Sequence, residues 1–152
     1  MAMSEPCFAR SGAASAVPDL DLYADPAAEP CALIVDDDLD LRGAFAVALR
    51  RVDPALRLDW ATSVRGAIEQ LAKRPYEFVV ADYLLDDGVG IEVKRWVDRF
   101  EPGLPFAIVS VFPFSQEIVR RGGRAVPFLA KPFAIQELHE LLAKLRESAR
   151  FR

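Results

Sequence analysis

Short apolar runs alternate with longer amphipathic segments from residue 31 onward. Apolar residues continue without interruption through Cys31–Val35, Phe78–Ala81 and Phe106–Val109, and a polar residue follows each run. Strands buried on both faces of a parallel sheet have this pattern. Leu56–Trp60 alternates like a strand, and Val126–Leu129 is a further short apolar run. Together these segments predict a five-stranded sheet.

The segments between the predicted strands repeat apolar residues at the spacing of an amphipathic helix. This spacing predicts helices around residues 41–49, 64–71, 93–97 and 135–145. Ser63 is placed to cap the second of them. Between the last two strands, Pro113 and the pair Gly122 and Gly123 leave room for only a short or irregular fourth helix. Strands that alternate with helices predict an α/β fold with a doubly wound parallel sheet.

The composition is that of a globular protein, with 52% hydrophobic and 28% charged residues among 152. This length fits one domain with a sizeable core and excludes a fully disordered chain. The 19 lysines and arginines against 23 acids leave a net charge of -4, so no basic field attracts nucleic acid. The longest uncharged run, residues 102–116, is too short to span a membrane, and the first residues do not resemble a secretory signal. We therefore expect a cytoplasmic protein that contacts neither membrane nor nucleic acid directly.

Residues 1–30 differ from the rest of the chain in charge and composition. They contain five acids and one base, whereas residues 31–152 contain 18 acids and 18 bases. Prolines and alanines are frequent in residues 1–30, and no helical or strand period is visible there. We expect an acidic, mobile extension over residues 1–30, a folded domain over residues 31–148 and a tail over residues 149–152.

Polar residues that can support chemistry follow four of the predicted strands. They are Asp36, Asp37, Asp38, Asp82, Ser110 and Lys131. The carboxyl ends of strands are where open parallel sheets place their reactive groups. If the first and third strands are neighbours, Asp36, Asp37 and Asp82 converge, and their charges require a hard divalent cation such as Mg²⁺. Leu84 is placed to add a backbone carbonyl to that cation.

A carboxylate beside Mg²⁺, with a lysine and a hydroxyl across the cleft, is suited to phosphoryl transfer. The cation and the lysine stabilise charge on the phosphoryl oxygens, and Asp82 is the natural acceptor. A solvated acidic loop or a helix cap is the ordinary explanation of any one of these residues. Their joint occurrence at successive strand ends favours the site.

Four motifs in chain order match a known family. They are Ile34-Val35-Asp36-Asp37-Asp38, Val79-Val80-Ala81-Asp82-Tyr83 followed by Gly88 and Gly90, Ile108-Val109-Ser110, and Phe128-Leu129-Ala130-Lys131-Pro132-Phe133. On these motifs, residues 31–148 resemble the receiver domain of two-component response regulators. The resemblance implies a flavodoxin-like fold with strand order 2-1-3-4-5 and five flanking helices.

The resemblance also implies roles for the residues of the site. Asp36, Asp37 and Asp82 would hold Mg²⁺, and Asp82 would accept a phosphoryl group from a histidine kinase or a phosphotransfer protein. Lys131 would contact the phosphoryl oxygens, and the peptide bond between Lys131 and Pro132 is expected to be cis. No enzymatic activity is expected beyond self-phosphorylation and autodephosphorylation.

Two further residues match the switch of this family. Ser110 corresponds to the hydroxyl that moves after phosphorylation, and Phe128 to the aromatic residue that then turns inward. The family signals through the face formed by its fourth helix, fifth strand and fifth helix. We therefore expect a downstream protein partner, and a possible homodimer through the same face.

The chain departs from the usual receiver pattern near the acceptor and the switch. Asp86 stands where the family often has proline, and the bulky Val111 follows the switch hydroxyl. Leu84 and Phe112 flank the expected path of attacking water. Apolar bulk there predicts a longer-lived phosphoryl group, because water is hindered from reaching it.

Two alternatives from other functional classes remain open. A receiver-like scaffold could bind partners without phosphorylation, and the atypical fourth helix is its best support. Asp36-Asp37-Asp38 could also be the Asp-x-Asp nucleophile motif of haloacid-dehalogenase-like phosphatases. Asp40 stands where that motif usually has threonine or valine, and the chain is short for that family.

Overall fold

A computed structural model describes residues 29–112 and 126–152 of the chain. The strands of the main sheet are β1 (Cys31–Val35), β2 (Arg57–Ala61), β3 (Phe78–Asp82), β6 (Phe106–Ser110) and β7 (Phe128–Ala130). The helices are η1 (Leu39–Leu41), α3 (Arg42–Val52), α4 (Val64–Lys73), α5 (Gly90–Phe100) and α7 (Ile135–Arg150). A short antiparallel hairpin, β4 (Leu84–Leu85) and β5 (Gly88–Val89), lies between β3 and α5.

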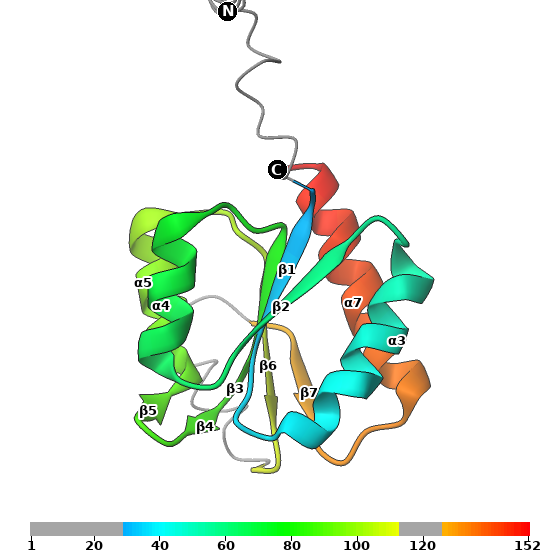
Figure 1. Cartoon of the computed structure of the whole chain (residues 1–152), viewed down its shortest axis with the longest axis horizontal. Helices are drawn as coiled ribbons and strands as arrows, with labels where there is room; N and C mark the ends of the chain where they lie inside the picture. The colour runs from blue at the N-terminus through cyan, green and yellow to red at the C-terminus, as the bar shows by residue number, and fades with distance from the viewer. Residues whose placement is uncertain (1–28, 113–125) are drawn as a thin grey trace, which may run out of the picture.

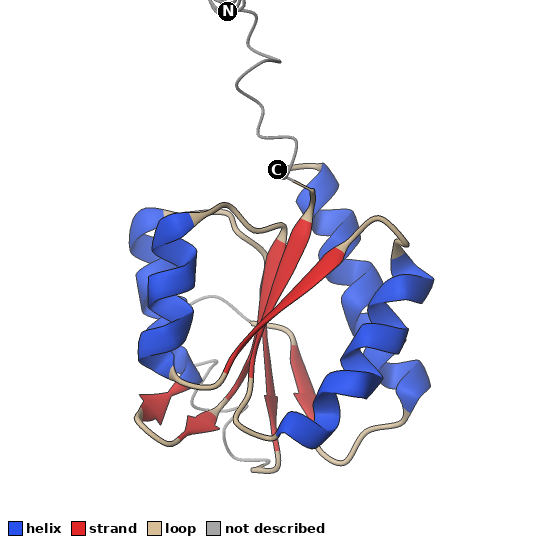
Figure 2. Ribbon diagram, in the orientation of Figure 1, coloured by secondary structure: helices blue, strands red, loops and turns tan. Residues whose placement is uncertain are grey.

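The main sheet is parallel, with five strands in the order β2-β1-β3-β6-β7. Helices α4 and α5 cover one face and helices α3 and α7 cover the other (Figure 1). Figure 2 shows the resulting three layers, with helices on both faces of the sheet. The predicted α/β class and strand order are therefore confirmed. No helix within the described ranges has both the length and the apolar character to cross a lipid bilayer.

The uninterrupted apolar runs arise because both faces of the central strands are buried. Along β1, Cys31, Leu33 and Val35 pack against α4 and α5, whereas Ala32 and Ile34 pack against α3 and α7. The same alternation continues along β3 and β6. Each strand therefore contributes to two hydrophobic layers, which leaves its polar residues only at its ends.

Element boundaries differ from the predictions at the edges of the sheet. Strand β2 begins and ends one residue later than predicted, and β7 begins two residues later, at Phe128. The hairpin β4–β5 was not predicted. Helix α7 continues to Arg150, two residues into the predicted tail. The predicted N-terminal extension and the irregular fourth helix lie almost wholly outside the described residues.

A charged network fastens the C-terminal helix to the amino-terminal end of the sheet. The guanidinium of Arg146 on α7 donates to Asp53 Oδ2 at 2.9 Å and to Glu77 Oε1 at 3.1 Å. The backbone N–H of Ala55 and the bond from Arg146 lower the pKa of Asp53 below its ordinary value. The Arg146 side chain is largely buried, so the loss of one partner leaves charges poorly solvated.

Replacing Arg146 with leucine is expected to lower the free energy of unfolding at pH 7 by about 1–3 kcal/mol. In the native chain, the lowered pKa of Asp53 adds stability above the unfolded pKa of about 3.9, and this is lost as pH falls through the folded pKa. The difference in the free energy of unfolding between the native chain and Arg146→Leu should therefore become smaller in acid. Urea unfolding at pH 7 and in acid measures this, with Lys144→Leu, at an exposed position on the same helix, as the control. If this difference in the free energy of unfolding stays constant with pH, Arg146 does not act through ionised Asp53.

Candidate functional site

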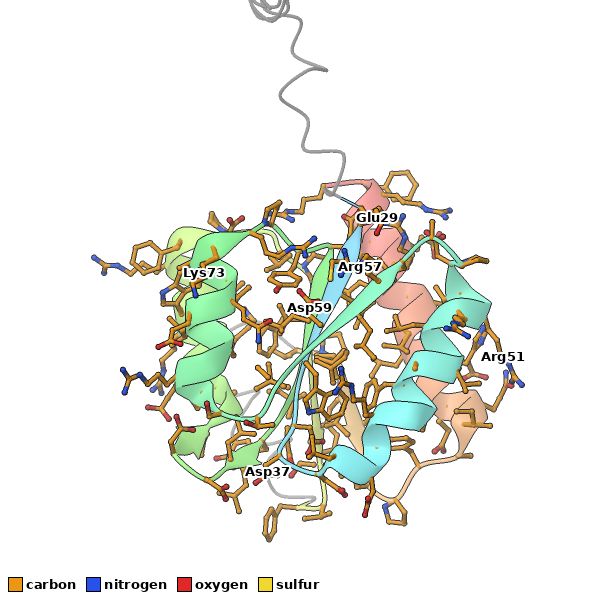
Figure 3. All side chains as sticks on the ribbon, in the orientation of Figure 1. Glu29, Asp37, Arg51, Arg57, Asp59 and Lys73 are labelled. Atoms are coloured by element: carbon orange, nitrogen blue, oxygen red, sulfur yellow. The ribbon has the colours of Figure 1, made fainter. Side chains whose placement is uncertain are left out.

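The acidic residues meet because their strands are neighbours in register. Val35 of β1 pairs with Ala81 of β3, so Asp36 and Asp82 occupy the next positions on adjacent strands. Figure 3 shows Asp37 at this end of the sheet and Arg57 toward the opposite end. Carboxylate oxygens of Asp36, Asp37 and Asp82 all lie within 4.8 Å of one another. The structure therefore brings the predicted acidic set together.

Lys131 follows the edge strand β7 and contacts two of these carboxylates. Its Nζ donates to Asp36 Oδ2 at 2.7 Å and to Asp82 Oδ2 at 3.1 Å. The backbone N–H of Lys131 donates to the Ser110 carbonyl at 2.8 Å, which anchors the start of the loop. The peptide bond between Lys131 and Pro132 is cis. The lysine thus spans β6 to reach the acids of β1 and β3.

The two buried carboxylates differ in how much of their bonding capacity is used. Asp36 is 2% exposed, and its other oxygen, Oδ1, accepts the Asp38 N–H at 2.8 Å. The Asp82 side chain is 13% exposed, and its Oδ1 has only a long contact of 3.4 Å with the Leu84 N–H. Among the described residues, both oxygens of Asp36 are therefore held by short hydrogen bonds, whereas Asp82 Oδ1 has a weaker contact.

The titration of the site follows from burial and mutual repulsion. Burial, and then the negative charge of Asp36, raise the pKa of Asp82 even though Lys131 opposes the shift. Partial desolvation of the otherwise exposed Asp37, followed by the charges of Asp86 and Asp36, raises the pKa of Asp37. Burial disfavours the Lys131 ammonium, but hydrogen bonds and charges from Asp36 and Asp82 outweigh it and raise the pKa of Lys131. One lysine does not neutralise the set.

The donor set fits a hard divalent cation. Converging carboxylate oxygens with residual repulsion match the oxygen ligands that Mg²⁺ takes in proteins. Asp37 is exposed, so a cation bound there could retain several waters, as Mg²⁺ prefers. The residues that would hold it are Asp36, Asp37 and Asp82, with the Leu84 carbonyl as a further predicted ligand.

The predicted switch residues lie on β6 and β7, the two strands that come after β3 in the order of the main sheet. Ser110 ends β6 and is fully buried, and its hydroxyl accepts the Phe112 N–H at 3.1 Å. Phe128 begins β7 opposite Ile108 and is half-buried against the hydrophobic layer under α4 and α5. Ser110 and Lys131 are linked through the backbone bond described above, so the residue that bears the hydroxyl and the residue that bears the ammonium are held side by side.

Apolar side chains stand at the mouth of the site. Leu84 is 50% exposed and Val111 is 57% exposed, and they follow the strand ends that bear Asp82 and Ser110. Exposed side chains of this size next to a polar cleft can restrict the approach of water or contact a partner.

Two residues of the site were missed by sequence reasoning. The indole N–H of Trp60, near the end of β2, donates to the Asp36 carbonyl at 2.8 Å. Asp87 in the hairpin accepts from the Val64 and Arg65 backbone N–H groups at 2.8 and 3.0 Å. Trp60 lies near the carboxyl end of a predicted strand, and this position could have indicated that it belongs to the site. The bonds of Asp87 join segments that are distant in sequence, and no local pattern indicates them.

Comparisons with known proteins agree with this geometry. Residues 32–143 match the family described as the response regulator receiver domain. The chain is 32% identical over 113 residues to the response regulator protein PilR of Pseudomonas aeruginosa, which covers 74% of this chain and 25% of that protein. It is 28% identical over 129 residues to the C4-dicarboxylate transport transcriptional regulatory protein DctD of Rhizobium meliloti, which covers 81% of this chain and 26% of that protein.

Solved structures give the same result. The non-phosphorylated HemR receiver domain from Leptospira biflexa superposes with a TM-score of 0.65 at 27% identity, covering 78% of this chain and 94% of that one. The chain spans only about a quarter of the length of the curated relatives PilR and DctD. The similarity to those proteins is therefore confined to one part of each of them.

Replacing Gly90 with alanine is expected to disturb the site as well as the fold. A Cβ at Gly90 would lie 2.2 Å from the Asp82 carbonyl oxygen, so α5 or the end of β3 would have to move. We expect a loss of about 1–3 kcal/mol in the free energy of unfolding, together with weaker Mg²⁺ binding. Urea unfolding and Mg²⁺ titration measure both.

Gly43→Ala on α3 is the matched control, because a Cβ there has no atom within 4 Å. This control should keep Mg²⁺ binding and gain at most about 1 kcal/mol from its higher helix propensity. Equal losses in the free energy of unfolding in the two variants would show that the close approach of Gly90 to the Asp82 carbonyl is not the cause of the loss.

Proposed function

The chain belongs to the response regulator receiver domain family, and from this premise we propose that it accepts a phosphoryl group on Asp82 and signals to a protein partner. The donor would be a histidine kinase or a phosphotransfer protein. The observation that carries the proposal is the shared contact of Lys131 Nζ with Asp36 and Asp82, beside the converging carboxylates. We further propose that the receiver unit occupies residues 31–148 and works in the cytoplasm.

Asp82 is the best acceptor among the converging carboxylates. Both oxygens of Asp36 are held by hydrogen bonds of 2.7 and 2.8 Å, whereas Asp82 Oδ1 is nearly free. Burial is the first cause of the raised pKa of Asp82, so its carboxylate is poorly solvated in the cleft before metal binds. In the proposed step, an oxygen of Asp82 attacks phosphorus while the P–N bond to the donor histidine breaks.

The surrounding charges suit the phosphorylated state. Lys131 already lies against Asp82, so its ammonium can pair with a phosphoryl oxygen after a small movement. When bound, Mg²⁺ would supply further positive charge next to the phosphoryl oxygens. Asp36 retains its bond to Lys131 and keeps the ammonium oriented toward the cleft.

The output would follow from rearrangement of Ser110. Phosphorylation adds a charge of roughly −1.5 to −2, with oxygens that accept hydrogen bonds strongly. We propose that the Ser110 hydroxyl leaves the Phe112 N–H to donate to a phosphoryl oxygen. The space it vacates would let the half-buried Phe128 turn inward and shift the population of the surface around β7 and α7. A protein partner, or a second copy of the chain, would recognise that surface.

The native chain is expected to gain the mass of one phosphoryl group when incubated with acetyl phosphate and Mg²⁺, and Asp82→Asn is expected to gain none. Intact-mass spectrometry measures this, and removal of Mg²⁺ with EDTA should abolish the adduct. Asp38→Asn is the matched control, because the Asp38 side chain is exposed and accepts the Asp40 N–H at the cap of η1, and the backbone N–H that Asp38 donates to Asp36 is unchanged by the substitution. An adduct that persists in Asp82→Asn, or none in the native chain, would argue against Asp82 as the acceptor and favour a scaffold that works without phosphorylation.

Replacing Leu84 with alanine is expected to shorten the lifetime of the phosphoryl group severalfold. The exposed Leu84 side chain hinders the approach of water, whereas its backbone carbonyl is unchanged by the substitution. The decay of the adduct after removal of acetyl phosphate measures the lifetime. Leu39→Ala, an exposed apolar residue on η1, serves as the control. Equal lifetimes in the native chain and Leu84→Ala would remove apolar shielding as the cause.

A further inference from the structure

The main sheet holds the chain as far as the residue after the acceptor, where the Tyr83 N–H donates to the Val109 carbonyl of β6 at 3.0 Å. Strand β3 ends at Asp82, and the hairpin β4–β5 that follows pairs only with itself. The Gly90 N–H donates to the Tyr83 carbonyl at 2.7 Å, and the Val89 N–H donates to Glu92 at 2.8 Å. These bonds define the shape of the hairpin and its junction with α5. They do not connect the hairpin to the segments that follow β1 and β2.

Leu85 of the hairpin is buried in the hydrophobic layer under α4 and α5, and Asp87 adds hydrogen bonds that join the hairpin to the start of α4. The two carboxylate oxygens of Asp87 accept separately from the Val64 and Arg65 backbone N–H groups at the start of α4, at 2.8 and 3.0 Å. These bonds lower the pKa of Asp87, so the side chain remains ionised across the neutral range. A charged acceptor at a helix N-terminus is favourable both as a hydrogen-bond partner and toward the helix dipole.

The first turn of α4 divides its N–H groups between a local and a distant acceptor. The Ser63 hydroxyl accepts the Gly66 N–H at 2.9 Å, and the Ser63 carbonyl accepts the Ala67 N–H at 3.0 Å. The serine cap and the packing of the apolar face of α4 already favour a helix that begins at this position. The bonds of Asp87 therefore do more for the position of the hairpin than for the existence of the helix.

The turn that Asp87 holds is connected to the first acidic segment as well. The carbonyl of Ala61, at the end of β2, accepts the Asp36 N–H at 2.9 Å, and Trp60 donates to the Asp36 carbonyl. Residues 60–65, which end β2, turn and begin α4, therefore contact the segment that bears Asp36 through the end of β2 and the hairpin through the start of α4. The two groups of predicted Mg²⁺ ligands are positioned against one common turn.

We propose that Asp87 is a positioning residue of the phosphorylation site, because it fastens the hairpin after Asp82 to the same turn that supports Asp36. This inference rests on the proposed function for its consequence, which is the placement of the Leu84 carbonyl and the adjoining backbone toward Mg²⁺. It makes a separate claim about the chain without metal. The hairpin is held by Asp87 before any cation binds.

The experiment compares Asp87→Asn with Asp86→Asn in the full chain. Each variant removes one negative charge from the same hairpin loop, but only Asp87→Asn replaces an acceptor oxygen facing a backbone N–H with an amide donor. Asp86 neighbours Asp37, so a purely electrostatic effect on Mg²⁺ would be larger in Asp86→Asn. Positioning by Asp87 predicts the reverse order. Ser63→Ala is a third variant, which weakens the cap of α4 and leaves the bonds of Asp87 in place.

The first measurement is hydrogen exchange without metal. We expect the backbone amides of residues 84–89 to exchange faster in Asp87→Asn than in the native chain, and to keep native protection in Ser63→Ala and Asp86→Asn. The second is Mg²⁺ affinity, followed by the NMR shift of the Trp60 indole N–H, which contacts the Asp36 carbonyl. We expect about tenfold weaker binding in Asp87→Asn, the lower end of the effect of removing an outer partner of a metal site. Ser63→Ala should stay within about twofold, as expected when the outer partner is left in place.

The two measurements separate this inference from the proposed function. Native protection of the hairpin in Asp87→Asn would overturn the inference whether or not Mg²⁺ binds. Faster exchange in Asp87→Asn, with no Mg²⁺ response in any variant, would support positioning by Asp87 and count against the proposed metal site. A larger loss of affinity in Asp86→Asn than in Asp87→Asn would assign the effect to charge and overturn the inference.

Discussion

The contact of one lysine with two buried carboxylates is the constraint around which the site is arranged. Lys131 Nζ lies 2.7 Å from Asp36 and 3.1 Å from Asp82, and all three side chains are largely buried. Removing such charges from water costs several kcal/mol per ion unless their partners are well placed. A single ammonium between crowded carboxylates satisfies this need only in part. The remaining negative charge is what makes the cleft suitable for a divalent cation and then for a phosphoryl group.

The fold meets this constraint through strand order and through the loops at one edge of the sheet. Asp36 and Asp82 follow neighbouring strands, whereas Lys131 follows β7 and reaches past β6. Phe45 packs edge to face against both Trp60 and Phe133, with ring centroids 5.8 and 6.2 Å apart. Through these contacts, Phe45 connects Trp60, which donates to the Asp36 carbonyl, with Phe133 in the loop that bears Lys131. The network of Arg146 lies at the opposite end of the sheet, so it contributes to stability without limiting movement at the site.

The central strands and the acidic set could be predicted from the sequence because each has a strong local cause. Uninterrupted apolar runs such as Cys31–Val35 occur where both faces of a strand are covered, and the carboxyl ends of parallel strands gather at one edge. The hairpin β4–β5 has only two residues in each strand, so it leaves no period to detect. The bonds from Val64 and Arg65 to Asp87 depend on how α4 packs beside the hairpin. Such contacts arise from tertiary structure and have no signature in the neighbouring residues.

The most direct test of the account is an NMR comparison of the full chain before and after addition of beryllofluoride with Mg²⁺, a stable mimic of the phosphoryl group. If the charge balance around Lys131 controls the switch, the amide signals of Ser110, Phe112 and Lys131 should show the largest shifts. The reason is that the Ser110 hydroxyl must leave its present bond to the Phe112 N–H. Changes at Phe128 and along α7 should accompany them. Shifts confined to Asp37 and its neighbours, with Ser110 and Lys131 unchanged, would mean that the cleft binds ions without operating the switch, and would contradict the central claim.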